Sequence, residues 1–301
     1  MQDRDKFGAS DALMLMAVVF WAVNFSLIKI ALREFSPLGF NGIRMVVASV
    51  ILVSFFLISR EGFSMTRSDF WKIIVLGLIG NTVFQMFFIH GLNWSTASST
   101  AIVMAMTPVF VALLSTTSKQ EKIHWAAWVG IAVSFVGLYL VLTKQPGVFR
   151  FSWEEVRGDL LILFGNLCWA IYTVFSKPLL ERMSPLKLTS TTMAVGALFY
   201  LPFCLKDLSQ LPYSEISLGA WGALLYSSFF ALTLSYLIWY GSVKRVGNTK
   251  TAIYSNITPI LTVIIAYFFI AERITPLQGI GAGIIILGVY FARLGYHHFR
   301  A

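Results

Sequence analysis

The chain has 301 residues, of which 57% are hydrophobic and 12% are charged, and its mean hydropathy is +0.75. About a quarter of the residues of a soluble domain are charged, so this composition excludes a soluble globular protein and indicates one that lies mostly in lipid. The net charge of +9 comes from short clusters of Lys and Arg between long apolar runs, which argues against a nucleic-acid partner. Cys168 and Cys204 lie inside apolar runs, without the spacing of a disulfide framework or a zinc site.

The long apolar runs predict helices that cross a membrane. A helix needs roughly 20 apolar residues to cross the hydrocarbon core of a bilayer, where its backbone polar groups must be satisfied internally. The sequence therefore predicts an all-α membrane protein, and the first helix is expected to be an uncleaved anchor because no signal-peptide cleavage site follows it. Ten segments meet the length requirement: 11–32, 37–59, 70–91, 95–116, 122–142, 158–179, 185–206, 217–241, 248–270 and 275–294.

The basic residues predict the orientation, because cytoplasmic loops are enriched in Lys and Arg. A cytoplasmic N-terminus places most of the Lys and Arg between segments on the inner side, including Lys244 and Arg245, and few, such as Arg33, on the outer side. An even number of crossings returns the C-terminus to the side of the N-terminus. We therefore expect both termini to be cytoplasmic, with residues 144–157 as an external linker between two halves.

The two halves repeat one pattern. WAVNFSLIKIALREFSP, which begins at Trp21, and WAIYTVFSKPLLERMSP, which begins at Trp169, share Trp, Ala, Lys, Leu, Ser and Pro at the same relative positions. The register continues through four later matches: Gly91 with Gly241, Thr107-Pro108 with Thr258-Pro259, Glu121 with Glu272, and Gly137 with Gly288. Each half holds an odd number of predicted helices, so the second copy enters the membrane from the opposite face. Residues 11–143 and 158–294 are therefore predicted to be inverted five-helix repeats, an architecture of secondary transporters.

This pattern resembles the drug/metabolite transporter superfamily and, within it, the ten-helix EamA-type permeases. The resemblance covers nearly the whole chain. It is carried by Trp21, Asn24, Lys29, Ser36-Pro37, Arg44, Thr107-Pro108-Val109-Phe110, Glu121, Gly130 and Gly137, and by Trp169, Lys177, Ser184-Pro185, Thr258-Pro259, Glu272 and Gln278-Gly279. It implies alternating access around a central cavity lined mainly by helices 1, 3, 4, 6, 8 and 9, as in the amino acid and metabolite exporters of similar length, without specifying the substrate.

Polar and aromatic residues inside the predicted helices are candidates for the substrate site, because polar groups in hydrocarbon are costly. Asn81, Gln85 and Phe88 are spaced so that they share one helical face. An aromatic and an amide side chain from each half can form an amphipathic pocket. The alternatives are amides that only bond neighbouring helices and Trp residues of the interfacial belt. The candidates for the central cavity are Trp21, Asn24, Asn81, Gln85, Phe88, Met104, Trp169, Tyr172, Tyr254 and Ser255.

Pro108 and Pro259 are candidate hinges, because proline removes a backbone hydrogen bond and bends a helix. The alternative is a static kink satisfied by the neighbouring Thr. Lys29 is expected to extend its ammonium to the membrane interface. Arg44, deeper in its segment, either holds helix-end carbonyls or draws an anionic group into an outer vestibule.

The acidic residues do not indicate direct proton coupling, because no Asp or Glu lies deep within a predicted segment. Glu121 and Glu272 are expected to cap the fifth and tenth helices or to brace the gates.

These features predict a secondary transporter that moves small organic metabolites such as amino acids, with export as the expected direction. It is expected in the bacterial inner membrane as a monomer or weak homodimer, with no cofactor and no metal. The alternatives are a channel-like facilitator and a membrane-embedded enzyme. An enzyme is disfavoured because the sequence has no HExxH, GxSxG or Gly-rich phosphate loop.

Overall fold

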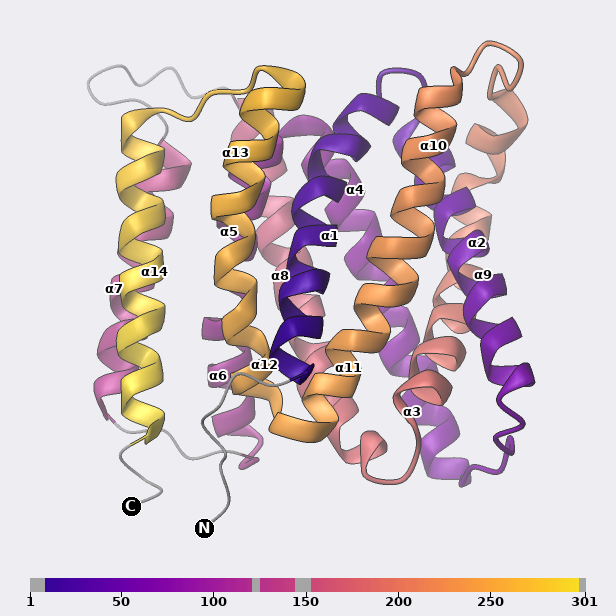
Figure 1. Cartoon of the computed structure of the whole chain (residues 1–301), viewed down its shortest axis with the longest axis horizontal. Coiled ribbons are helices and arrows are strands. Elements are labelled where there is room, and N and C mark those ends of the chain that lie inside the picture. Colours follow the sequence, from indigo (N-terminus) through magenta and orange to yellow (C-terminus); the bar gives the residue numbers. More distant parts are fainter. Residues whose placement is uncertain (1–8, 121–124, 144–152, 298–301) are drawn as a thin grey trace.

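The structure is a computed structural model that describes residues 9–120, 125–143 and 153–297. Every regular element within these ranges is a helix, and the helices run side by side through the bundle in Figure 1. Eight helical stretches are long and apolar enough to cross a membrane: Asp11–Ala31, Pro37–Ile58, Arg67–Trp94, Ala97–Thr117, Trp153–Leu180, Pro185–Gln210, Leu218–Val246 and Asn248–Ile270. Trp128–Val141 and Pro276–Gly288 are shorter apolar helices. The all-α membrane class is thus confirmed.

The elements follow the predicted segments closely. The first half contains α1 (Ala9–Ala31), α2 (Pro37–Ile58), α3 (Arg67–Gly77), η1 (Leu78–Val83), α4 (Phe84–Trp94), α5 (Ala97–Met104), α6 (Thr107–Thr117) and α7 (Trp125–Thr143). The second contains α8 (Trp153–Leu180), α9 (Pro185–Gln210), α10 (Leu218–Tyr226), η2 (Ser227–Leu234), α11 (Ser235–Val246), α12 (Asn248–Ile253), η3 (Tyr254–Ile257), α13 (Thr258–Ile270) and α14 (Pro276–His297). We call the face where α1 begins and α14 ends the proximal face, and the face where α1 ends the distal face (Figure 1).

The repeated Ser-Pro pairs begin equivalent helices. Ser36 caps α2 by accepting a hydrogen bond from Gly39 N at 3.3 Å, and Ser184 caps α9 by accepting one from Lys187 N at 3.0 Å. Proline follows each serine at a position where a helix needs no N–H donor. The same local chemistry therefore starts the second helix of each half.

α8 begins at Trp153, inside the stretch 144–157 that was predicted to be a linker. Glu154 and Glu155 lie in its first turn, where negative charge stabilises the positive end of the helix dipole. The charged residues that looked like loop composition are thus helix-start residues. The rest of the predicted linker, 144–152, lies outside the described residues.

The third helical stretch of each half is interrupted at the same place. η1 separates α3 from α4 and η2 separates α10 from α11, and both are π-helical. A π-helical turn widens the helix and leaves backbone groups without their usual partners, which is why such turns often occur at functional sites. The inverted repeat is thus visible in the backbone as well as in the sequence.

The two halves interlock reciprocally. α2 packs on η2 while α9 packs on η1, and α1 packs on α11 while α4 packs on α8. Close approach at the α4–α8 crossing requires glycine, because a Cβ on Gly91 would lie 2.8 Å from the carbonyl oxygen of Gly158. α7 and α14 pack mainly on one another and form one end of the bundle in Figure 1.

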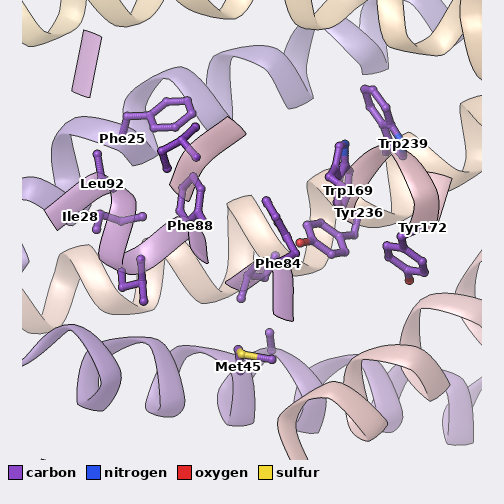
Figure 2. Packing of buried hydrophobic residues seen from close by; sticks show 14 of the residues in the cluster. Phe25, Ile28, Met45, Phe84, Phe88, Leu92, Trp169, Tyr172, Tyr236 and Trp239 are labelled. Carbon is purple, nitrogen blue, oxygen red and sulfur yellow. The ribbon is translucent and has the colours of Figure 1, made fainter. Parts of the chain in front are cut away.

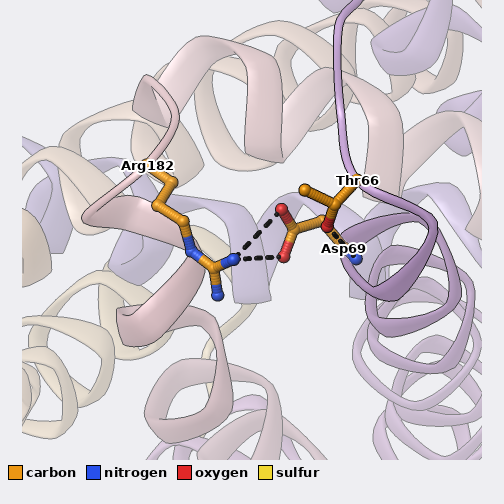
Figure 3. Close-up of polar contacts among 3 residues, drawn as sticks. All are labelled: Thr66, Asp69 and Arg182. Atoms are coloured by element: carbon orange, nitrogen blue, oxygen red, sulfur yellow. Dashed lines mark hydrogen bonds and ion pairs between the residues drawn. The ribbon is translucent and has the colours of Figure 1, made fainter.

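An ion pair joins the halves at the proximal face (Figure 3). Arg182 Nη1 lies 3.1 Å from Asp69 Oδ1, and Thr66 accepts a hydrogen bond from the backbone N–H of Asp69 at the start of α3. The Arg182 side chain is half exposed, so the pair contributes about 0–1 kcal/mol of stability.

Candidate functional site

A cluster of aromatic side chains occupies the middle of the bundle. We call it the aromatic cluster: Trp21, Phe84, Trp169, Tyr172, Tyr236, Trp239 and Tyr240. Trp169 lies at its centre, with ring-centroid distances of 4.9 Å to Tyr236 and 6.2 Å to Trp21. Figure 2 shows Trp169, Tyr236 and Trp239 gathered beside Phe84. The cluster draws on α1, α4, α8 and α11, so both halves build it.

The indole groups of the cluster bond to protein rather than to a membrane interface. Trp21 Nε1 donates to the carbonyl oxygen of Ala231 in η2 at 3.1 Å, and Trp239 Nε1 donates to Thr173 Oγ1 at 3.2 Å. Trp169 is 4% exposed. An interfacial belt therefore does not describe these residues, and Trp21 supplies a donor to a carbonyl of the π-helical turn.

Arg44 lies beside the aromatic cluster and is completely buried, with 1% of its surface exposed. Its Nη1 donates to Ser227 Oγ at 2.8 Å, and its Nη2 donates to Gln85 Oε1. Gln85 Nε2 in turn donates to Tyr236 Oη at 3.1 Å. The guanidinium carbon also lies 5.7 Å from the ring centre of Phe88.

The charge of Arg44 has no carboxylate partner in the part of the chain that the structure describes. Its hydrogen-bond acceptors there are a hydroxyl and an amide oxygen, and its Nε has no partner. Placing an arginine at the centre of a membrane helix costs about 2.5–3.5 kcal/mol on insertion scales. A cation retained at this cost is a functional candidate.

The other predicted polar residues lie in different surroundings. Asn24 is buried in α1, and its Oδ1 has no hydrogen-bond partner among the described residues. Asn81 is buried in η1 against Gly196, whose missing Cβ makes room for it. Tyr172 is buried and hydrogen-bonds Thr192 through its hydroxyl. The structure thus brings Trp21, Gln85, Phe88, Trp169 and Tyr172 into or beside the cluster.

Met104 and Pro108 lie at a break between α5 and α6. Asn166 of α8 donates to the carbonyl oxygens of Val103 and Met104 at 3.2 and 3.3 Å, and the Thr107 hydroxyl lies 2.7 Å from Asn166 Oδ1. The carbonyls that the kink frees are therefore satisfied by a neighbouring helix. This geometry fits a braced kink, and the hinge role of Pro108 stays a prediction.

Tyr254 and Ser255 form the start of η3, away from Arg44. The hydroxyl of Tyr254 donates to Asp11 at the proximal end of α1, and Ser255 Oγ donates to the carbonyl oxygen of Ala252 at 2.6 Å. Tyr254 thus joins the kink before Pro259 to α1, whereas the bond of Ser255 stays within the kink. They lie towards the proximal face, so a pathway through the bundle meets them at a different depth from Arg44.

Lys29 binds carbonyl groups at the end of α4. Its Nζ donates to the carbonyl oxygens of Leu92, Asn93 and Ser95 at 3.1, 3.3 and 2.8 Å. Positive charge stabilises the carboxyl end of a helix, where carbonyl groups lack partners. Lys29 thus fastens α1 to α4 at the distal face, and the expectation that its ammonium reaches the membrane interface stays a prediction.

Glu272 caps a different helix from the one predicted. Its two carboxylate oxygens accept hydrogen bonds from Ala97 N at 3.0 Å and Ser98 N at 2.7 Å. The carboxylate therefore binds the start of α5, whereas the sequence predicted a cap on the tenth helix. It joins the connection between α13 and α14 to the first half, as a gate brace would. Glu121 lies outside the described residues.

A buried carboxylate lies near the distal end of α8, beside the turn between α4 and α5. Asp159 of α8 is completely buried and accepts hydrogen bonds from Ser95 Oγ and, at 2.8 Å, from Ser99 Oγ. The sequence did not single out Asp159 because it is the second residue of the predicted segment 158–179. In the structure, α8 begins earlier, at Trp153. The turn between α4 and α5 is thus held by Lys29, Glu272 and Asp159 together.

A hollow of about 340 Å³ opens at the distal face beside this turn. Its lining combines two cations and a carboxylate with an amide and two apolar side chains: Lys29, Leu32, Arg33, Asn93, Ile270 and Glu272. Both halves contribute, so movement of one half against the other would change its width.

We expect Glu272→Gln to lower the free energy of unfolding by about 0.5–2 kcal/mol, because the neutral amide is a weaker partner for the start of α5. Thermal unfolding in detergent measures this. Glu215→Gln is the matched control, since Glu215 is exposed in the connection before α10. Equal melting temperatures for the two variants would contradict the capping role.

Sequence reasoning missed part of the aromatic cluster. Tyr236, Trp239 and Tyr240 follow one another at helical spacing on a single face of α11, and that spacing is visible in the sequence. Arg44 was noted, but only the structure places it against residues of the opposite half.

Comparison with known proteins gives the same architecture. The EamA-like transporter family matches residues 9–143 and again 156–294. The "Uncharacterized transporter YyaM" of Bacillus subtilis (strain 168) is 32% identical over 93% of this chain and 92% of its own length. An "Uncharacterized transporter" of Archaeoglobus fulgidus is 29% identical over 95% of this chain and 97% of its own.

A solved crystal structure aligns over 97% of this chain and 99% of its own, with a TM-score of 0.70 and 15% identity, a likeness that concerns the fold alone. The family match extends over both halves, and each match ends where the repeat predicts. The resemblance drawn from the sequence is confirmed: the chain belongs to the EamA-like transporter family.

Proposed function

We propose that this membrane transporter is a secondary carrier that moves small organic metabolites, amino acids or similar amphipathic compounds, by alternating access. Export is the proposed direction. The aromatic cluster and Arg44 form the central site, together with Asn24, Asn81, Gln85, Phe88 and Met104, and Ser255 lies towards the proximal gate. The distal turn held by Lys29 and Glu272 and the proximal contact of Tyr254 with Asp11 are the two gates.

The observation that carries this proposal is the reciprocal packing of η1 and η2. Each interrupted helix packs on the second helix of the opposite half, and both adjoin the aromatic cluster. A displacement of one half against the other therefore changes both gates while the site stays between them, as inverted-repeat transporters require. Pro108 and Pro259 are the proposed hinges.

A carrier shows saturable flux, and an excess of substrate on the opposite side of the membrane accelerates that flux. This behaviour distinguishes it from the two alternatives. We propose to measure this counterflow in liposomes with labelled amino acids and related aromatic acids and amines. A channel-like facilitator gives flux without counterflow stimulation. A membrane-embedded enzyme converts the compound without net movement. Either result would overturn the carrier proposal.

We further propose ten crossings, a cytoplasmic proximal face and a location in the bacterial inner membrane. In a variant without Cys168 and Cys204, we expect a cysteine at Gln210 to react with an impermeant maleimide on intact cells. Gln210 ends α9 at the distal face and is exposed. A cysteine at Met65, in the connection after α2, should react only after the cells are opened. The reverse pattern would contradict this orientation.

A further inference from the structure

We propose that Arg44 binds the carboxylate of an organic acid or amino acid that carries one negative charge and whose apolar part packs on the rings beside it. This inference rests on the proposed carrier function and names the chemical class of its substrate. It begins from a fully buried guanidinium whose bonding partners, among the described residues, are all uncharged.

The group formed by Arg44, Ser227, Gln85 and Tyr236 carries donors for which no acceptor is recorded among the described residues. Ser227 Oγ accepts from Arg44 and Tyr236 Oη accepts from Gln85, so both hydroxyl protons remain to be donated. Arg44 Nε has no acceptor within the described residues either. Three donors without an acceptor, one of them cationic, suit an anion, because charge-assisted hydrogen bonds to a carboxylate satisfy them together.

The number of charges limits the substrate class. Arg44 is the single cation recorded in contact with this group of donors, and it forms no ion pair with a described carboxylate. A second negative charge on the ligand would be buried without a partner, which is strongly unfavourable because it loses its hydration. A monocarboxylate is therefore favoured over a phosphate ester or a dicarboxylate.

The surroundings favour an apolar body. The guanidinium carbon lies 5.7 Å from the ring centres of both Phe40 and Phe88. Phe84 connects this region to the aromatic cluster, with its ring centre 5.6 Å from that of Phe88 and 5.4 Å from that of Trp169. Aromatic or large aliphatic groups pack well on such surfaces.

Two aromatic rings, Phe25 and Phe88, connect the neighbourhood of Lys29, which lines the distal hollow, with Arg44. Phe25 lies one turn below Lys29 on α1, and its ring centre is 5.9 Å from that of Phe88, beside Arg44. Figure 2 shows Phe25 and Phe88 adjacent to one another. Displacing these two rings would connect the hollow with Arg44, so they are the expected inner barrier of the distal entrance.

A purely structural role is the competing explanation, because Arg44 joins α2 to η2 and α4. The two roles predict different effects of replacing Arg44. A structural clamp affects the stability of the protein without regard to the charge of a ligand, whereas a binding role affects carboxylates selectively.

The test measures binding to the full-length protein in lipid nanodiscs by thermal shift and tryptophan fluorescence. The probes are two acid–amide pairs of nearly equal shape: phenylacetate with 2-phenylacetamide, and L-phenylalanine with L-phenylalaninamide. We expect at least one acid to bind while its amide does not. Arg44→Gln should weaken that acid about 10- to 100-fold, which is the loss of one charge-assisted hydrogen-bond set. Arg44→Lys keeps the positive charge, so it should bind the acid more tightly than Arg44→Gln does.

Tyr236→Phe removes one donor and keeps the ring, so it decides the question if Arg44→Gln does not fold. It should weaken binding of the acid, because one of the hydroxyl donors to the carboxylate is lost. Arg182→Gln, at the proximal face, is the matched charge control and should bind like the wild type. Equal affinity of acids and amides, an unchanged acid affinity in Arg44→Gln or Tyr236→Phe, or no binding of either acid at millimolar concentration would overturn the proposal.

Counterflow with the same probes separates this proposal from the carrier function. Saturable counterflow of the amides, equal in wild type and Arg44→Gln, would leave a carrier whose site does not use Arg44. Flux of every probe without saturation or counterflow would instead reject the carrier, and with it the role of Arg44 in transport.

Discussion

Replacing Trp169 with alanine is expected to lower the free energy of unfolding by about 3–5 kcal/mol and to abolish most counterflow in the protein that remains folded. The side chain is buried and its ring contacts six others of the aromatic cluster, from both halves. Its removal leaves a large cavity that the surrounding rings fill only in part. Thermal unfolding in detergent and flux per folded molecule measure the two effects.

Trp169→Phe keeps most of the ring contacts, so it should lower the free energy of unfolding and the counterflow much less. Trp153→Ala is the matched control, because Trp153 is 69% exposed at the start of the same helix. If Trp169→Ala melted like Trp153→Ala and transported normally, the cluster would be neither the core of the bundle nor part of the pathway.

Adding a single methyl group at Gly80 is expected to destabilise the protein by about 1–3 kcal/mol or more. A Cβ at this position in η1 would lie 2.2 Å from Cγ of Tyr172, which is itself fully buried. The Tyr172 ring has no free space to move into, so overpacking forces the α8–η1 contact apart. The melting temperature and the yield of monodisperse Gly80→Ala protein measure the effect.

Gly222→Ala is the matched control for this substitution. Gly222 lies in α10, and a Cβ there would meet nothing within 4 Å. Alanine should therefore be neutral or stabilising, because glycine is the poorer helix former by roughly 1 kcal/mol. Similar melting temperatures for the two variants would show that η1 and α8 are less closely packed than described.

The fold could be predicted from the sequence because each of its determinants is local. Apolar runs set the helix lengths, and Ser36-Pro37 and Ser184-Pro185 mark the starts of equivalent helices. The register of Gly91 with Gly241 indicated the repeat. The π-helical turns were not predicted, because an extra residue in a helical turn leaves no distinct mark in an apolar run.

The site could be predicted only in part. Trp21 and Trp169 were found because the repeat marks them, and they lie together. The contact of Arg44 with Ser227 joins residues from opposite halves, which a one-dimensional pattern cannot place. The capping of α5 by Glu272 was missed for the same reason, since the partner is distant in the chain.

The two kinks differ in a way that bears on movement. The break before Pro108 is held by Asn166, which supplies its amide to the freed carbonyls. At the position of the repeat that corresponds to Asn166, α1 has Val18, which has no polar side chain. The kink before Pro259 thus lacks the equivalent amide, and we expect α12 and α13 to move more readily than α5 and α6.

The most direct test of alternating access is a pair of distance measurements between spin labels in lipid. One label pair, at Arg33 and Arg273, spans the distal face, and the other, at Ala12 and Lys250, spans the proximal face; all four residues are exposed. We predict that a transported probe shifts the two distance distributions in opposite directions, because one gate closes as the other opens. Unchanged distributions at both faces, in protein that still transports the probe, would contradict the account.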